Sequence, residues 1–298
     1  MSSRRTDSEV IAAFAADFDS AILNDRHIRQ CGRALADTMA VAIAARGEPA
    51  VQRAYRYVDG LAPRLVDGCG TKLRTTASLW GWQQASTVEG AALFNGIAAH
   101  VLDFDDASSP MSGHPSVALL PALVALAEAR GPAGLRLIGA YIVGFEICCK
   151  LGRALDVTHY ARGWHMTATV GTLAAAAACG HLLGLDREQI SHAIGLAIAQ
   201  TGGTRENFGT DAKSFQAGQL NAAAIRAALL AEQGITASHH SLDGKAGYAT
   251  LYSGGEDITP VLETLGMLPL EIDRSGIEVK NILPAMASIG RSTGSSTS

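Results

Sequence analysis

The stretch ATVGTLAAAAACGHLLGL, residues 168–185, is the longest apolar run of the chain. It is as long as a membrane span, but alanine, glycine and threonine dominate it and it contains a histidine. Small side chains of this kind let neighbouring helices approach closely. We therefore expect a helix buried in a protein core rather than one that faces lipid.

The remainder of the sequence favours a mainly α fold built around this helix. Hydrophobic residues make up 48% of the 298 residues and aromatic residues only 5%. Apolar residues recur at helical spacing over 7–46, 78–104, 115–131, 135–155, 185–203 and 214–234. Pro115 suits a first helical turn, Gly131 and Gly234 suit helix ends, and Asp186 with Gln189 resembles a capping box. Pro121 predicts a kink.

The pattern of apolar residues changes near residue 265. Residues 1–265 contain no convincing strand pattern and are expected to form one large all-α helical domain. The segment EIDRSGIEVKNI (271–282) alternates and carries β-branched residues, which predicts a strand or hairpin. Residues 266–298 are therefore expected to be the start of a small α+β lid domain, followed by a disordered low-complexity tail, RSTGSSTS.

Charge and cysteine usage restrict the class of partner. A net charge of −4 and a pI near 6.1 argue against nucleic acid and against an anionic membrane. The N-terminus has no apolar segment typical of a secretory signal. The five cysteines are odd in number and show no C-x-x-C spacing, which is typical of thiols in a reducing compartment. We expect a cytoplasmic protein.

Three segments place a cationic or titratable side chain at the expected N-terminus of an apolar helix. These are His114 before PSVALLPAL, His165 in GWHMTATVG and Lys213 in GTDAKSFQAG. Helix N-termini have unpaired N–H groups and the positive end of the helix dipole, so they bind anions. If the three ends converge, they predict a pocket for a polycarboxylate.

The pattern alone leaves simpler readings open. His114 and His165 could be plain helix caps, and Lys213 could be an ordinary exposed lysine. The acidic trio of HVLDFDDASSPMSGHPS, Asp103, Asp105 and Asp106, could be a solvated helix end. His239 and His240 fall in an expected loop, and His181 is most simply a core or surface histidine.

A metal site is the least favoured reading of the acidic trio. The sequence D-F-D-D differs from the D-D-x-x-D motif with which isoprenoid synthases hold magnesium diphosphate, and a second carboxylate-rich helix is missing. Cysteine and histidine ligands at zinc spacing are also missing. We expect no metal, and a magnesium-dependent synthase-like enzyme is the weakest alternative.

The sequence resembles the MmgE/PrpD family, which includes 2-methylcitrate dehydratase, cis-aconitate decarboxylase and iminodisuccinate epimerase. The resemblance runs through LWGWQQASTVEGAALFNGIAAHVLDFDD, GHPSVALLPALVALAEARG, GWHMTATVGTLAAAAACGHLLGLD and GTDAKSFQAGQLNAAAIRAALLAEQGITAS. It implies a large all-α domain with a smaller α+β lid, a homodimer, and an active site between the domains without metal or organic cofactor.

The resemblance also implies roles for particular residues. It points to Asp103, His114, His165 and Lys213 as catalytic, and to Lys280 in EVKN as substrate-binding. The substrate would be a small di- or tricarboxylate. A proton would be removed next to a carboxylate, followed by loss of hydroxide, loss of carbon dioxide or reprotonation. A dehydratase of the 2-methylcitrate type is the first expectation, and the acid and base roles stay open.

Two local departures from the family bear on the substrate. Ala107 stands where decarboxylase-like members have threonine, so the hydroxyl of Ser108 or Ser109 is expected to replace it, and Ser108 is our candidate for substrate binding. Gln216 stands where many members have histidine.

The segment NILPAMASIGRSTGSSTS does not resemble the family. With suitable synonymous codons, one inserted base after the codon of Asn281 gives NYPTRNGIHRSIDGIIDL, which has family character. We therefore expect a frameshifted, truncated member with reduced or absent activity. The alternative is an inactive helical remnant that only associates with itself.

Overall fold

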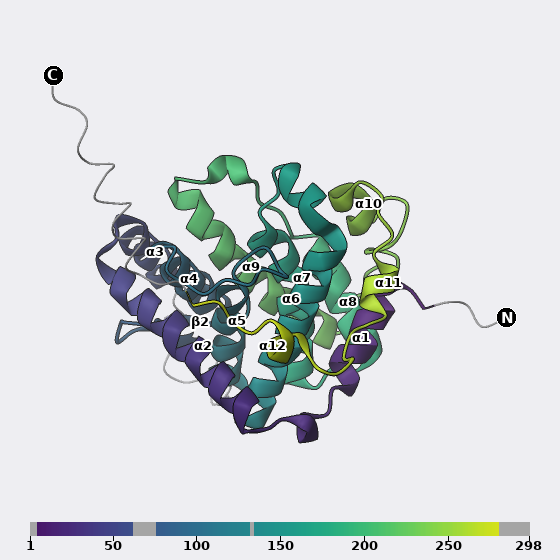
Figure 1. Cartoon of the computed structure of the whole chain (residues 1–298). Helices are drawn as coiled ribbons and strands as arrows, with labels where there is room; N and C mark the ends of the chain where they lie inside the picture. Colours follow the sequence, from purple (N-terminus) through teal and green to yellow (C-terminus); the bar gives the residue numbers. More distant parts are fainter. Residues whose placement is uncertain (1–4, 62–75, 132–133, 280–298) are drawn as a thin grey trace.

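The computed structural model describes residues 5–61, 76–131 and 134–279, and it is mainly α-helical (Figure 1). The longer helices are α1 (Asp7–Asp17), α2 (Asp25–Ala44), α3 (Pro49–Asp59), α4 (Val88–His100), α5 (Pro115–Arg130), α6 (Leu135–Ala161), α7 (Met166–Leu183), α8 (Arg187–Ile198) and α9 (Asp211–Glu232). Short helices are α10 (Tyr248–Ser253), α11 (Thr259–Leu262), α12 (Glu271–Arg274) and the 3-10 turns η1 (Ser20–Ile22), η2 (Ala45–Gly47) and η3 (Arg205–Asn207). The strands β1 (Thr76–Ser78) and β2 (Ala85–Thr87) complete the described elements.

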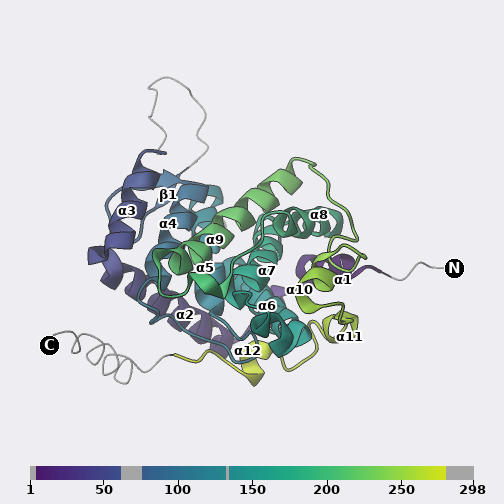
Figure 2. The same cartoon turned by 90° about the horizontal axis from the view of Figure 1, so that it is seen from above.

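Helix α7, which contains most of the alanine-rich stretch, lies at the centre of the helical body (Figure 2). It contacts α5, α6, α8 and α9, and every residue from Met166 to Leu182 is buried. By length and hydropathy it is the one helix of the described ranges that could cross a membrane, but 89% of that window is covered by the protein itself. The prediction of a buried core helix is confirmed.

Glycines bring α4 and α9 into close contact. A Cβ atom on Gly96 would lie 2.8 Å from the Cα of Gly218, and one on Gly218 would lie 2.6 Å from Cγ1 of Ile97. The backbones of the two helices therefore touch where larger side chains would hold them apart. This contact brings the C-terminal end of α4, which leads into the acidic trio, close to the N-terminal part of α9.

Most predicted helix ends are confirmed. Pro115 occupies the first turn of α5, and Gly131 ends that helix with a left-handed φ of 86°. Asp186 and Gln189 form both hydrogen bonds of a capping box at the start of α8. Gly234 follows the end of α9, also with a left-handed φ. The kink expected at Pro121 stays a prediction.

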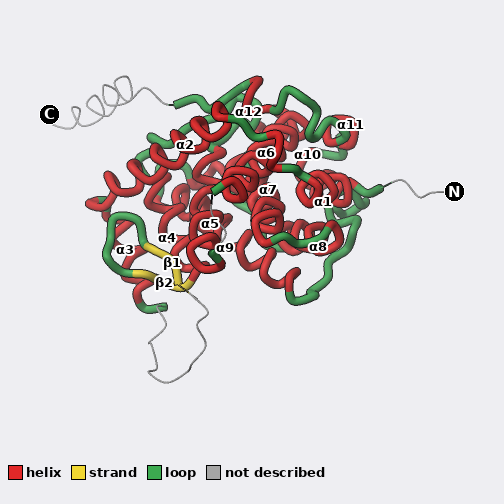
Figure 3. The backbone as a smooth tube through the Cα atoms, turned by 90° about the horizontal axis from the view of Figure 1, so that it is seen from below, coloured by secondary structure: helices red, strands yellow, loops and turns green. Residues whose placement is uncertain are grey.

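The segment before α4 differs from the sequence-based expectation. A helix was expected from residue 78, but β1 and β2 form an antiparallel hairpin with Ala77 opposite Ser86 (Figure 3). Asn95 of α4 contributes to this arrangement, since its amide accepts from Trp80 N and donates to the Ser78 carbonyl. The prediction that residues 1–265 contain no strand was therefore wrong over these six residues.

The strand or hairpin expected at 271–282 is also wrong for its described part. Glu271–Arg274 form the short helix α12 instead, and Glu271 is bound to α6. Its N–H donates to Glu146 at 2.7 Å, and its carboxylate contacts Lys150 at 3.2 Å and Arg153 at 3.1 Å. Further along, Glu278 forms a single β-bridge with Ala107. The boundary at residue 265 stays a prediction, and the tail lies outside the described residues.

Candidate functional site

Three helix N-termini meet at one cavity of about 400 Å³. His114 is the N-cap of α5, His165 is the N-cap of α7, and Lys213 lies in the first turn of α9. All three side chains line the cavity, together with Asp103 and Ser108. The structure thus brings together every described candidate residue, and their chemical roles stay predictions. Lys280 lies outside the described residues.

Asp103 connects the acidic trio to α5 and α9. Its Oδ1 lies 2.9 Å from Nζ of Lys213 and 3.6 Å from Nε2 of His114. Asp103 also has a positive φ of 55°, a left-handed conformation that is uncommon for residues other than glycine. Such strained backbone is frequent at ligand sites, because the surrounding contacts must hold it in place.

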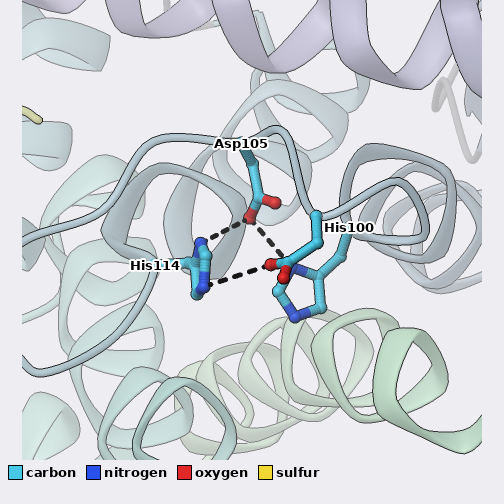
Figure 4. A group of neighbouring side chains, drawn as sticks. His100, Asp105 and His114 are labelled. Atoms are coloured by element: carbon cyan, nitrogen blue, oxygen red, sulfur yellow. Dashed lines mark hydrogen bonds and ion pairs between the residues drawn. The ribbon is translucent and has the colours of Figure 1, made fainter. Parts of the chain in front are cut away.

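Asp105 holds two histidines (Figure 4). Its Oδ2 lies 2.8 Å from Nδ1 of His100 and 3.1 Å from Nδ1 of His114, and its side chain is fully buried. Burial alone would raise the pKa of Asp105, but the charges and hydrogen bonds of the two imidazoles hold it below its usual range. Burial lowers the pKa of His100 despite the neighbouring carboxylate. Asp105 is therefore an ionised acceptor that orients His114 toward the cavity.

The environment of His114 decides which of its nitrogens carries a proton. Nδ1 lies 2.9 Å from the carbonyl oxygen of Asp106 and 3.1 Å from the Asp105 carboxylate. Both neighbours can only accept, so Nδ1 is protonated. Nε2 is the nitrogen on the Asp103 side, where a second carboxylate favours a proton as well. Carboxylate oxygens thus lie on both sides of the His114 ring.

His165 has the opposite environment. Burial, followed by the charge of His100, lowers its pKa to about 3, so the ring is neutral at physiological pH. Its Nδ1 lies 2.6 Å from Oε1 of Gln216. The ring stacks on His100, with centroids 5.9 Å apart, and meets the edge of Phe208 at 5.0 Å. The cavity is therefore lined by one histidine between two carboxylates and by one neutral histidine.

The hydroxyl-bearing loop beside the cavity includes both serines considered as replacements for threonine. Ser108 is buried, and its Oγ contacts Sγ of Cys149 at 3.6 Å. Ser109 is bound by Glu278, whose Oε1 accepts from Ser109 N at 3.0 Å and from Ser109 Oγ at 2.6 Å. The loop after the acidic trio can therefore bind a carboxylate through an N–H and a hydroxyl.

Asp105 and Asp106 do not form a solvated helix end. Both side chains are fully buried. Asp106 accepts from Ser116 N at 3.2 Å and from Ser116 Oγ, which also contacts Tyr141 Oη at 2.8 Å. Burial raises the pKa of Asp106 to about 7. Asp103 is the exposed member of the trio, with 50% of its side chain accessible, but it is ion-paired with Lys213.

Among the residues that the structure describes, two groups of side chains have atoms close enough to hold a metal ion. One comprises His100, Asp103, Asp105 and His114, and the other Glu188, His192 and His239. In the first group, Nδ1 of each histidine is bound to Asp105, so an ion there would have to displace these hydrogen bonds. The second group lies away from the cavity. The expectation of a metal-free site stays a prediction.

The remaining histidine candidates lie elsewhere. His181 is buried and its Nδ1 contacts the Ala15 carbonyl at 2.7 Å, as expected of a core histidine. His239 contacts Ser191 at 3.2 Å, and His240 contacts Asp243 at 3.2 Å, both in the loop that follows α9. Neither lines the cavity.

Sequence reasoning missed three contributors to the site: the hydrogen-bonding roles of His100 and Asp105, and the contact between Gln216 and His165. His100 is the last residue of α4, and Asp105 lies five residues further along, beyond the helix. Helical spacing therefore could not predict that their side chains meet. The departure from the family at Gln216 was the available signal, but its partner lies 51 residues away.

Comparison with known proteins agrees with the family resemblance found in the sequence. The family model described as MmgE/PrpD N-terminal domain matches residues 9–261. The chain is 38% identical to a cis-aconitate decarboxylase of Homo sapiens over 168 residues, covering 55% of the chain and 35% of the relative. It is 29% identical to a cis-aconitate decarboxylase of Mus musculus over 237 residues (78% and 46%). It is 31% identical to the cis-aconitate decarboxylase-like protein oryM of Aspergillus oryzae over 193 residues (61% and 40%). The matches thus span less than half the length of these relatives.

Proposed function

The chain belongs to the MmgE/PrpD family, and from this premise we propose that it is a lyase whose cavity binds a small di- or tricarboxylate. The observation that carries the proposal is the meeting of three helix N-termini, with His114, His165 and Lys213, at one cavity. Each helix end adds the positive partial charge of its dipole, although the Ser116 N–H of α5 and the Ala212 N–H of α9 are already bound to Asp106 and Thr210. Together they suit a ligand with more than one carboxylate.

Lys213 is the group we propose for neutralising one substrate carboxylate. Its side chain is 19% exposed and faces the cavity beside Asp103. A second carboxylate can bind at the loop after the acidic trio, because Ser109 already donates an N–H and a hydroxyl to the carboxylate of Glu278. Two anion positions on one cavity match a substrate with two or three carboxylates.

The two cavity histidines suit opposite roles in proton transfer. We propose that neutral His165 accepts the proton from the carbon next to a carboxylate, while Lys213 stabilises the negative charge that develops there. The imidazolium of His114 then donates its Nε2 proton. In a dehydration this proton leaves with hydroxide as water. In a decarboxylation no proton is removed first: carbon dioxide leaves, its bonding electron pair stays on the carbon skeleton, and the His114 proton is added to that skeleton.

The names of the relatives put decarboxylation of cis-aconitate first among the reactions to be tested. Dehydration of a 2-methylcitrate-type substrate stays the second candidate, because it needs both a base and an acid and the cavity has one histidine suited to each. Ala107 supplies no hydroxyl, so Ser108 or Ser109 would supply the hydroxyl beside the acidic trio.

The test is turnover by the purified 298-residue chain. Cis-aconitate and 2-methylcitrate are each followed by proton NMR, with and without EDTA, for the wild type, for His165→Gln and for the control His240→Gln. We expect slow, EDTA-insensitive turnover of one substrate that falls by about 10²-fold or more in His165→Gln only. No turnover by the wild type, equal loss in both variants or dependence on a metal would contradict the proposal.

A further inference from the structure

We propose that Gln216 is a positioning residue that holds His165 as the Nδ1–H tautomer, so that Nε2 of His165 is the proton acceptor in the cavity. The side-chain amide of Gln216 has one donating and one accepting end. Its Nε2 donates to the carbonyl oxygen of Thr204 at 3.1 Å, and its Oε1 lies 2.6 Å from Nδ1 of His165. The amide thus joins the loop before α9 to the N-cap of α7.

The Thr204 carbonyl decides which way the amide points. A carbonyl oxygen can only accept, so the NH₂ end of Gln216 has to face it. The oxygen end then faces His165 and can only accept from Nδ1. A neutral imidazole carries one N–H, and here it has to be on Nδ1, which leaves the lone pair on Nε2. Rotating the amide by 180° would bring its NH₂ group to His165 and its oxygen to the Thr204 carbonyl oxygen. Two oxygens that can only accept would then face each other without a hydrogen between them.

Neighbouring backbone groups fix both Gln216 and His165 in place. Gln216 is buried, with 8% of its surface exposed. The backbone N–H of His165 donates to Gly203 O at 3.1 Å, and Trp164 forms a β-bridge with Thr204. The segment that accepts from Gln216 therefore also fixes the backbone of His165. A displacement of the amide would have to move this segment and the start of α7 together.

Gly203 leaves room for the amide. Its φ is 122°, and a Cβ atom there would lie 3.0 Å from both Cδ and Oε1 of Gln216. A larger residue at this position would push against the accepting end of the amide. The close fit indicates that this loop is shaped around the Gln216 side chain.

The protonation state of the ring agrees with this assignment. Burial and the charge of His100 keep the pKa of His165 near 3, so the ring has only one proton over the ordinary pH range. The tautomer therefore matters, because a neutral Nε2–H ring would present a donor to the cavity where a base is needed. Gln216 thus makes His165 a base by hydrogen bonding rather than by adding charge.

The tautomer is measured directly by long-range ¹H–¹⁵N NMR on the 298-residue chain labelled with ¹⁵N-histidine. The signals of His165 are those that disappear in His165→Gln. At pH 7 we expect a protonated Nδ1 and an unprotonated Nε2. An Nε2–H ring, or a doubly protonated ring, would overturn the proposal.

Variants separate positioning from simple folding. In Gln216→Leu we expect the ring to lose the single tautomer, whereas Gln216→Glu keeps an acceptor at Nδ1 and should keep the Nδ1 proton, although it loses the hydrogen bond to Thr204. Gln219→Leu, on the same helix but outside the cavity, serves as control and should leave the His165 signals unchanged. Retention of the Nδ1–H tautomer in folded Gln216→Leu would contradict the role of Gln216. Circular dichroism and the thermal midpoint establish that each variant is folded.

The kinetic consequence rests on the proposed function, whereas the NMR result does not. With an active substrate, Gln216→Leu should lower kcat by about tenfold or more with little change in KM, and Gln216→Glu should recover part of the loss. A correct tautomer without turnover would contradict the lyase proposal only. Turnover with the wrong tautomer would contradict the positioning role only.

Discussion

Nζ of Lys213 lies 2.9 Å from Oδ1 of Asp103, which joins the first turn of α9 to the loop that follows α4. Both side chains line the cavity. An incoming substrate carboxylate therefore has to compete with Asp103 for the lysine. The pair keeps the lysine in place before the substrate arrives, at the cost of some affinity for it.

Removing the charge of Asp103 should strengthen ground-state binding. In Asp103→Asn the competing carboxylate is gone, and asparagine tolerates the left-handed backbone at this position. We expect a several-fold lower dissociation constant for cis-aconitate by isothermal titration calorimetry, accompanied by slower turnover. Weaker binding in this variant would show that Asp103 itself contacts the substrate favourably.

Asp105 should be important for folding as well as for orienting His114. Asp105→Ala leaves the buried His100 Nδ1 without its acceptor, and we expect the free energy of unfolding to fall by about 3 kcal/mol in urea denaturation. The control Asp211→Ala breaks an exposed pair with Arg53 and should cost less than about 1 kcal/mol.

The effect of Asp105 should also depend on pH. Its folded-state pKa lies below the unfolded value, so its contribution to stability is present above about pH 4 and is lost as the pH falls further. The difference between wild type and Asp105→Ala should therefore shrink in acid. A difference that grows in acid would contradict the ionised state of this carboxylate.

Asp106 should show the reverse pH dependence. Its pKa rises from about 3.9 in the unfolded chain to about 7 in the folded protein. Between these values the folded state binds a proton that the unfolded state does not, so this group destabilises the fold as pH increases. Asp106→Asn should therefore gain stability relative to wild type between pH 5 and pH 8 in urea denaturation. A relative loss over that range would contradict the raised pKa.

The contact between α4 and α9 should not tolerate a methyl group. In Gly218→Ala the new Cβ would press on Ile97 and on the Leu93 carbonyl, and we expect a loss of about 1–3 kcal/mol in unfolding free energy. In the control Gly32→Ala, within α2, the Cβ would have no neighbour within 4 Å, so alanine should stabilise the helix by about 0.5–1 kcal/mol. Equal effects of the two substitutions would show that the helices can separate at this contact.

Local sequence chemistry was enough to predict the ends of α5 and α8 and the placement of His114, His165 and Lys213 at helix starts. Pro115, Gly131 and the capping box at Asp186 act within one turn of the chain, so their signals are complete in the sequence. The same holds for His114 and His165, which stand immediately before their helices. The meeting of the three helix ends depends on the packing of α4, α5, α7 and α9, which no single segment specifies.

The wrong predictions have tertiary causes. The alternation of EIDRSGIEVKNI favours a strand, but the ion pairs of Glu271 with Lys150 and Arg153 hold its first residues as a helix against α6. The hairpin of β1 and β2 depends on Asn95, whose amide binds the backbone of a segment that by pattern alone continues a helix. In both cases a distant side chain overrides the local pattern.

The most direct test of the carboxylate site is calorimetric titration of the 298-residue chain with cis-aconitate at low ionic strength, where screening is weak. The wild type is compared with Lys213→Met and with Lys245→Met, which removes a lysine away from the cavity. We expect saturable binding by the wild type and by Lys245→Met, and an affinity at least about tenfold lower in Lys213→Met. No binding by the wild type, or equal affinities in all three proteins, would contradict a carboxylate site at the meeting point of the three helices.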